Sequence, residues 1–453
     1  MPESSIIPSF PLERYFARRT HGDGMTFYFE LQFQGQIDVS RMCDAWAQCL
    51  VNHPRAFYRL QAGAASGWQP TTLCIDNHFS NGITGTPDKR DQHVDTADDS
   101  KRVICDPRDG VGVHLSVVQN QDAICLQFAV HHATFDGVGV SRLVYQLLRC
   151  YAGNPPIRDS QFSRSPRPPQ PEDNAEPDPT TVTAPGGAFP NLGNVWHTIR
   201  GRNLCLNAPI SDDSAQPPAI AAEQAMGETA MQFQFDPSQT VAITRTLRDR
   251  REVLNDVAVA VMLDSIGQLW APRNAHIMVM NPVQTRDFAA RHDSQNRLGI
   301  AFVRRHHDPS QTFGERLTSV SAELSHVRSH GVAGELEMGI GIAERLPGAL
   351  SVVEWMRWFT PTISLTCLPN FRPSRRAGFV RESMGWRLRG MRYAGTQILA
   401  PLPQSNQLAT ALYFSEGCLS YSIRYRTASM RGTAVTLGRR WAAMLAKHVR
   451  LPK

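Results

Sequence analysis

One stretch of the chain, residues 130–137, constrains the fold and the chemistry more than any other. It spells Val-His-His-Ala-Thr-Phe-Asp-Gly. The apolar run 123–130 before it indicates a buried strand, and apolar residues at three- and four-residue spacing across 140–148 indicate a helix after it. The pattern therefore predicts two adjacent histidines in a tight strand-to-helix turn, where side chains can face a ligand.

The flanking N-terminal sequence predicts further strands and one helix. Phe27, Phe29, Leu31 and Phe33 alternate with polar residues, which indicates a strand with one buried face. A helix follows, capped by Asp38 or Ser40 and closed at His53-Pro54. Alternation across 111–117 and a turn at 120–122 predict a hairpin that leads into the two histidines.

The C-terminal half shows the same mixture of strands and helices. Asn255 is a candidate cap for a strongly apolar helix over 256–270. The remaining predicted elements are a strand over 231–235, a buried strand over 277–280, a hairpin of 408–414 with 418–425, and a helix over 433–448.

Between these halves the composition changes abruptly. Residues 154–190 contain ten prolines among Ser, Asp, Glu and Gln, with few large aliphatic residues. Such a segment cannot bury enough apolar surface to offset its ordering entropy. We expect a lobe at 1–153, a proline-rich linker or crossover at 154–227 and a second lobe at 228–453. A proline-rich recognition ligand is the alternative interpretation of the linker.

Size and charge limit the class of protein. The 453 residues suffice for two large lobes, and the net charge of +6 is too mild for a nucleic-acid binder, though it would help to attract an anionic ligand. Nine cysteines without CxxC pairs indicate reduced thiols, so we expect a cytoplasmic protein. Neither a signal peptide nor an apolar run of about 20 residues is found, so no transmembrane segment is expected.

The 131–137 element matches the HHxxxDG signature and resembles the chloramphenicol-acetyltransferase-like superfamily. This superfamily includes condensation domains of non-ribosomal peptide synthetases and wax-ester acyltransferases. Weaker matches are the Pro-Val-x-x-Arg segment at 282–286 and Asn-x-Leu-Gly at 296–299. The stretch 363–371 departs from the Ser-Asn-Leu-Gly pattern of many relatives, and Asp-Phe-Gly-Trp-Gly is absent from the sequence. The resemblance implies an α/β fold with mixed sheets, in which two lobes form a V around a central tunnel.

The resemblance also implies roles for individual residues. His132 matches the general base, and a neutral imidazole with an ordinary pKa of about 6.5 suits that task. His131 is then structural support. Asp136 is expected to pair with an arginine, for which Arg286 is the candidate. At the start of the helix, the N–H of Gly137 is suited to a developing oxyanion.

Two further hydroxyl groups are candidate oxyanion donors, because some relatives place a hydroxyl in the corresponding stretch. They belong to Ser364 and Thr366.

The expected function is acyl transfer from a thioester to a hydroxyl or amine acceptor. The donor would be acyl-coenzyme A or an acyl or peptidyl carrier protein supplied as a separate polypeptide. No bound cofactor is expected, because coenzyme A or phosphopantetheine belongs to the donor substrate. The sequence contains no GxSxG nucleophile motif, which fits direct transfer.

Several alternatives compete with this interpretation. A non-catalytic condensation-like domain that binds a carrier protein or another partner is the main one, since 364–371 is altered. The HxxxxD signature of glycerolipid acyltransferases also fits His131 and Asp136. A metal site is not expected, because no ligand cluster with zinc-like spacing accompanies the histidines. His306-His307 is a second histidine pair without a following Asp-Gly.

A run of arginines could contact phosphates of coenzyme A or an acidic carrier protein, or could form a solvated basic face. Its members are Arg372, Arg375, Arg376, Arg381, Arg387, Arg389 and Arg392.

Overall fold

The protein is described here by a computed structural model. The structure describes residues 6–18, 23–61, 67–83, 102–156, 203–204, 206, 222–226, 229–270, 275–285, 296–330, 332–355, 361–368, 371–383, 385–403 and 406–451. Most of the predicted linker, and Arg286, lie outside these ranges.

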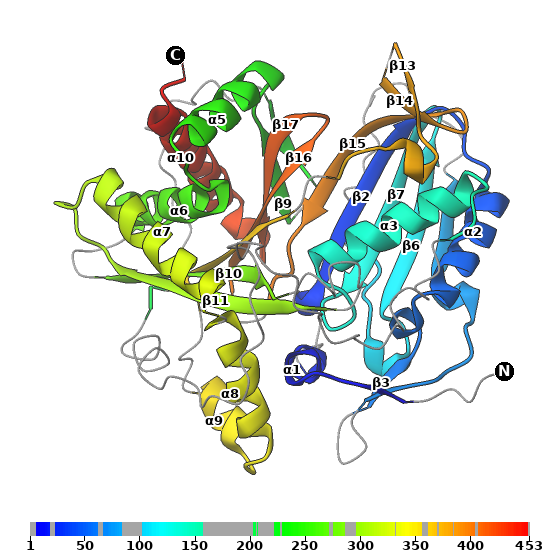
Figure 1. The fold of residues 1–453 in the computed structure, drawn as a ribbon, viewed down its shortest axis with the longest axis horizontal. Helices are drawn as coiled ribbons and strands as arrows, with labels where there is room; N and C mark the ends of the chain where they lie inside the picture. Colours follow the sequence, from blue (N-terminus) through cyan, green and yellow to red (C-terminus); the bar gives the residue numbers. More distant parts are fainter. Residues whose placement is uncertain are drawn as a thin grey trace, which may run out of the picture.

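Two seven-stranded mixed sheets form the frame of the molecule, one in each of two lobes that lie side by side (Figure 1). The N-terminal sheet has the order β13 (Val380–Glu382), β14 (Gly385–Leu388), β15 (Met391–Leu399), β2 (Thr26–Gln34), β7 (Ala123–His131), β6 (Val113–Asn120) and β5 (Phe79–Ile83). The C-terminal sheet has the order β11 (Leu298–His306), β10 (His276–Gln284), β12 (Ile363–Cys367), β16 (Leu408–Ser415), β17 (Cys418–Tyr425), β9 (Ala230–Gln234) and β8 (Ala222–Ala225).

Helices cover each sheet. On the N-terminal sheet lie α2 (Val39–Val51) and α3 (Gly137–Tyr151), and on the C-terminal sheet lie α5 (Pro237–Asp249), α6 (Leu254–Trp270), α7 (Phe313–Ser329) and α10 (Arg431–Val449) (Figure 1). Short polar side chains cap the N-termini of several of these helices. Asp38 caps α2 by accepting from the Arg41 N–H at 2.9 Å, and capping boxes begin α5 and α7.

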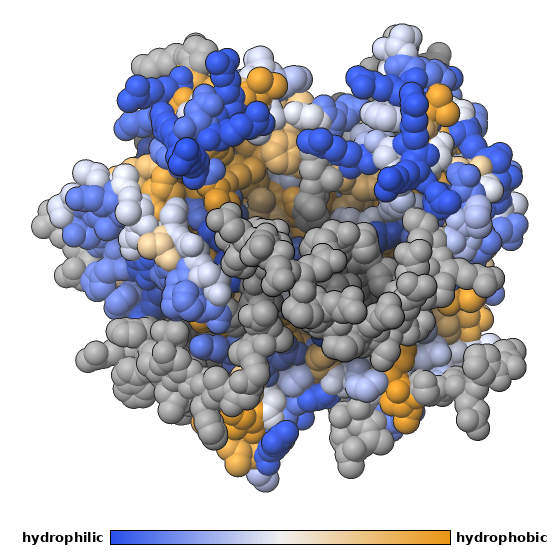
Figure 2. Space-filling view, viewed as in Figure 1, coloured by the Kyte–Doolittle hydropathy of each residue, from blue (hydrophilic) through white to orange (hydrophobic). Residues whose placement is uncertain are grey.

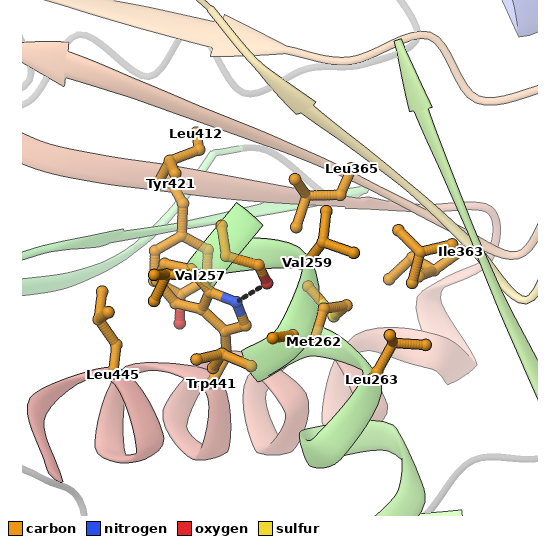
Figure 3. Packing of buried hydrophobic residues seen from close by; sticks show 14 of the residues in the cluster. Val257, Val259, Met262, Leu263, Ile363, Leu365, Leu412, Tyr421, Trp441 and Leu445 are labelled. Carbon is orange, nitrogen blue, oxygen red and sulfur yellow. Dashed lines mark hydrogen bonds between the residues drawn. The ribbon is translucent and has the colours of Figure 1, made fainter. Parts of the chain in front are cut away.

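The predicted cap of α6 is wrong. This helix begins at Leu254, so Asn255 lies inside it. The Asn255 side chain instead exchanges two amide hydrogen bonds with Asn281 of β10, at 2.9 and 3.0 Å. Around α6 the C-terminal core is closely packed, and the Trp441 indole donates to the Ala258 carbonyl at 3.2 Å (Figure 3).

A smaller unit closes the base of the molecule between the lobes (Figure 1). It contains the sheet β1 (Ile7–Pro8), β4 (Gly67–Gln69) and β3 (Arg59–Gln61), with α1 (Pro11–Arg18) beside α8 (Glu335–Glu344) and α9 (Ala349–Trp355). Arg14 of α1 forms an ion pair of 2.5 Å with Glu344 of α8. Single-turn 3-10 helices occur at Asp23–Met25, Pro54–Ala56, Ile75–Asn77, Pro107–Asp109, Val332–Gly334, Arg375–Ala377 and Ala428–Met430.

The division of the chain between the sheets differs from the predicted lobe boundaries in two places. Strands β13–β15, which the prediction placed in the C-terminal lobe, extend the N-terminal sheet, where β15 pairs with β2. Strand β8 extends the C-terminal sheet although it falls inside the predicted crossover. Residues far apart in sequence thus complete one sheet, which local patterns do not reveal.

Strand β2 also differs from the prediction of a single buried face. Tyr28 is fully buried and Glu30 is 1% exposed, although both alternate with the apolar residues. Arg102 and Arg424 lie over the Tyr28 ring at 5.0 and 5.2 Å. Arg424 belongs to β17, so the other lobe contributes to the burial of Tyr28 on this second face.

Candidate active site

The predicted strand-to-helix turn is present. Strand β7 ends at His131 and α3 begins at Gly137. Between them the backbone is tied down, since His131 N–H donates to the Gly112 carbonyl at 3.0 Å and His132 N–H to the Met25 carbonyl at 2.9 Å. These bonds fix where the two imidazoles point.

His131 lies entirely inside the N-terminal lobe, with no exposed surface. Its Nδ1 accepts a hydrogen bond from the Ala133 N–H at 3.1 Å. Burial lowers the pKa of His131 to about 3, and the Asp106 carboxylate opposes this only partly. The ring is therefore neutral at physiological pH and supports the turn.

His132 keeps 9% of its surface exposed, whereas His131 keeps none. Its ring lies between Phe16 of α1, at 5.1 Å, and Phe27 of β2, at 5.4 Å. Burial lowers the pKa of His132, opposed by the Asp136 carboxylate and by the carbonyls of His132 and Phe135. Its buried Nδ1 makes no hydrogen bond of normal geometry with the described part of the chain.

Asp136 holds the turn. It is the N-cap of α3, and its Oδ1 accepts from the Gly139 N–H at 2.7 Å. Its Oδ2 accepts from the Arg297 N–H at 2.9 Å, beside β11 of the other lobe. The predicted pairing with Arg286 concerns a residue outside the described ranges and stays a prediction.

Asn296 makes a second connection between the lobes. Its side-chain amide donates to the His132 carbonyl at 2.5 Å. Together with the Arg297 N–H, it fastens both ends of the turn to one short segment of the C-terminal lobe. The sequence prediction assigned no role to Asn296, although the Asn-x-Leu-Gly match at 296–299 contains it.

Gly137 lies directly against the side chain of Leu368. A Cβ atom at this position would lie 1.9 Å from Cδ2 of Leu368, the residue that follows β12. The end of β12 therefore reaches the first turn of α3. Any side chain at 137 would force Leu368 away.

The two candidate hydroxyl groups lie on β12, the strand that ends just before Leu368. Ile363 and Leu365 of β12 face the C-terminal core, so alternation places Ser364 and Thr366 on the opposite face, toward Leu368. Ser364 is 6% exposed, and its Oγ is buried without a hydrogen bond to any described residue. Thr366 is half-buried. An unsatisfied buried hydroxyl of this kind is suited to a ligand atom.

Figure 2 shows a hollow between the upper parts of the two lobes, with hydrophobic residues visible inside and hydrophilic residues at the rim. Within the described ranges, no group of three or more His, Cys, Asp or Glu residues is arranged to hold a metal ion. No single described helix is long and apolar enough to cross a membrane; α5 and α6 meet that test only together, bent by 105°.

Comparison with solved structures identifies the fold. The first condensation domain of the calcium-dependent antibiotic synthetase, in complex with a substrate analogue, matches with a TM-score of 0.63 and 15% identity over 98% of this chain and 96% of that chain. Polyketide synthase associated protein 5 from Mycobacterium tuberculosis matches with a TM-score of 0.56 and 15% identity over 98% and 99%. The X-domain from teicoplanin biosynthesis matches with a TM-score of 0.59 and 14% identity over 100% and 96%.

No family model and no curated protein sequence matches this chain. The structural matches nevertheless span nearly the whole chain and nearly the whole of each solved domain. They agree with the arrangement of mixed sheets and covering helices described above. This chain therefore has the α/β fold of the condensation domains, as its HHxxxDG element predicts.

Proposed function

We propose that this protein is an acyltransferase that moves an acyl group from a thioester to a hydroxyl or amine, with His132 as the general base. One observation carries the proposal. The imidazole of His132 lies where the two lobes meet and keeps 9% of its surface exposed, and Asn296 of the other lobe donates to its backbone carbonyl. Its buried Nδ1 has no hydrogen bond of normal geometry among the described residues, whereas buried polar groups are usually hydrogen-bonded.

The proposed reaction needs no covalent enzyme intermediate. Neutral His132 takes the proton of the acceptor, and the resulting oxygen or nitrogen attacks the thioester carbonyl carbon. Because Nδ1 is buried, Nε2 is the proton acceptor in this proposal. When the carbon–sulfur bond breaks, the imidazolium returns the proton to the leaving thiolate.

The negative charge on the carbonyl oxygen requires hydrogen-bond donors. Gly137 N–H opens α3, and helix N-termini favour developing negative charge. The Ser364 hydroxyl is a second donor, since it is buried and has no described partner. No resident cofactor is part of the proposal, because coenzyme A or phosphopantetheine enters with the donor.

The test is thiol release from a panel of acyl-coenzyme A esters in the presence of mixed alcohols and amines. Removing a general base usually costs about 100- to 10,000-fold in rate. We expect His132→Ala to lose turnover by that factor while keeping its melting temperature. His330→Ala, at an exposed position after α7, is the matched control and should keep full activity. Equal rates in wild type and His132→Ala would refute the assignment.

A second candidate function is binding without catalysis. Leu368 occupies the space beside Gly137, and this residue belongs to the stretch in which the chain departs from its relatives. The X-domain from teicoplanin biosynthesis, which shares the fold, has been solved in complex with OxyB. If wild-type protein binds acyl-carrier or partner proteins but releases no thiol with any donor, this alternative is correct.

A further inference from the structure

Five arginines gather at the C-terminal end of α3, remote from the catalytic turn. We call this set the arginine patch, and it consists of Arg41, Arg149, Arg375, Arg376 and Arg389. The helix has 15 residues. It is therefore about 22 Å long. It runs from between the lobes toward α2 at the outer side of the N-terminal lobe (Figure 1).

Backbone carbonyl groups fix three of these guanidinium groups. Arg41 Nε donates to the Tyr151 carbonyl at 2.8 Å, and an Arg389 terminal nitrogen donates to the Ala152 carbonyl at 3.1 Å. Arg149 donates to the carbonyls of Pro155 and Arg376 at 2.7 and 2.8 Å. Each guanidinium has five donor hydrogens, so donors remain for other acceptors.

Two of the fixed guanidinium groups lie next to each other. A terminal nitrogen of Arg41 lies 3.0 Å, and one of Arg389 3.1 Å, from the point where a Cβ of Gly153 would stand. Gly153 has φ +90°, so a glycine suits this position for its backbone as well as for its space. The chain thus holds two like charges close together, which costs electrostatic free energy.

These charges lack an ion-pair partner in the described part of the chain, where none of the five arginines pairs with a carboxylate. The nearby Asp38 carboxylate caps α2 by accepting from the Arg41 backbone N–H. Carbonyl groups at the C-terminal end of a helix attract cations, and this attraction accounts for one arginine at the end of α3. It does not explain why several arginines gather there.

A hollow adjoins the two neighbouring guanidinium groups. Its volume is about 390 Å³. The hollow is lined by Arg41 of α2, Tyr151 of α3 and Arg389 of the turn between β14 and β15. The other lining residues are Gln36, Ile37 and Asp38. Arginine pairs of this kind suit a phosphate, whose oxygens accept paired N–H bonds.

We propose that this hollow binds the phosphate group of a small phosphorylated ligand. Arg41 and Arg389 contact the phosphate oxygens, and the unpaired arginines around them raise the local concentration of anions. The site lies at the opposite end of α3 from His132, so it does not depend on the proposed acyl transfer.

Inorganic phosphate and pyrophosphate, titrated by calorimetry against sodium chloride of matched ionic strength, test the proposal. We expect both anions to bind, and Arg389→Gln to weaken binding at least tenfold. Arg372→Gln removes an exposed arginine that does not line the hollow, and it should leave affinity unchanged. Arg389 is exposed, so its variant is expected to fold. His132→Ala should bind phosphate like wild type.

Three results would overturn the proposal. The first is no heat of binding above that of the chloride control. The second is equal weakening by Arg372→Gln and Arg389→Gln, which would indicate a diffuse basic surface. The third is binding of a polyglutamate peptide without binding of either phosphate, which would indicate a docking surface for an acidic protein.

Discussion

His132 has lost most of its contact with water, and this loss determines the pH range in which it can act as a base. Burial lowers its pKa below the ordinary value of 6.5. The neutral form, which the proposed general base requires, therefore persists below pH 6.5. We expect the acid limb of the kcat/KM profile to have its midpoint below that value.

Phe16 provides a way to test this cause. Its ring packs on the imidazole, so Phe16→Ala should admit water, raise the pKa of His132 toward 6.5 and move the acid limb to higher pH. Leu12→Ala removes a buried side chain of the same helix that has no ring to stack on His132. It should lower stability without moving the limb. Identical profiles for both variants would contradict the role given to Phe16.

Asp136 contributes to stability through two hydrogen bonds, one within α3 and one to the other lobe. Asp136→Ala removes the cap of α3 and the acceptor of the Arg297 N–H, and we expect a loss of about 2 kcal/mol in unfolding free energy. Asp136→Asn keeps one carbonyl oxygen and should lose less. Urea denaturation measures both.

Asp236→Ala is the matched control for this change. Asp236 caps α5 but makes no bond to the other lobe within the described residues. A loss for Asp136→Ala no larger than that for Asp236→Ala would mean that the contact with Arg297 adds nothing. The prediction from sequence gave Asp136 the partner Arg286, which lies outside the described ranges, and did not anticipate the Arg297 backbone N–H that Asp136 accepts from.

At the scale of elements, local patterns predicted what local forces determine. The strand β2 itself, the cap of α2 at Asp38 and the β16–β17 hairpin all appear where they were expected. Each depends on neighbours within a few residues. The burial of Tyr28 and Glu30 could not be predicted in this way, because their neighbours are distant in sequence: Arg102 lies by both, and Arg424 of β17 lies over Tyr28.

The contact between the end of β12 and the start of α3 is another long-range feature. Gly137→Ala should clash with Leu368 and cost about 1–2 kcal/mol, the usual range for overpacking with some relief by a flexible side chain. Leu368→Ala in the same protein should restore part of this loss. A double variant whose losses merely add would show that the two residues do not touch.

At the scale of the whole molecule, several histidines are buried in neutral form and link stability to pH. Burial lowers the pKa of His53 and of His114 to about 4, from an ordinary 6.5. As pH falls below 6.5, the unfolded chain takes up protons that the folded chain cannot. Stability contributed by these groups is therefore complete above pH 6.5 and declines below it.

Each such histidine changes the slope of stability against pH by at most about 1.4 kcal/mol per unit. Urea denaturation between about pH 5 and pH 6.5 should show a flatter slope in His53→Gln than in wild type. Buried carboxyl groups such as Glu13, whose pKa is raised by burial, also change stability with pH. Their contribution is the same in both proteins, so it cancels when the two slopes are compared. Parallel slopes would mean that His53 is not held neutral.

The two-lobe architecture could be predicted from the HHxxxDG resemblance. That strands β13–β15 join the N-terminal sheet could not, and this arrangement has a consequence for the synthesis of the chain. Strand β2 pairs with β15 along Tyr28–Gln34 and Arg392–Leu399, so one edge of the N-terminal sheet stays open until residues 358 positions further along the chain have been made. Open strand edges recruit foreign strands. A nascent chain on the ribosome thus exposes this edge until residue 399 has left the exit channel, and the half-made protein is at its most vulnerable to mispairing throughout that interval.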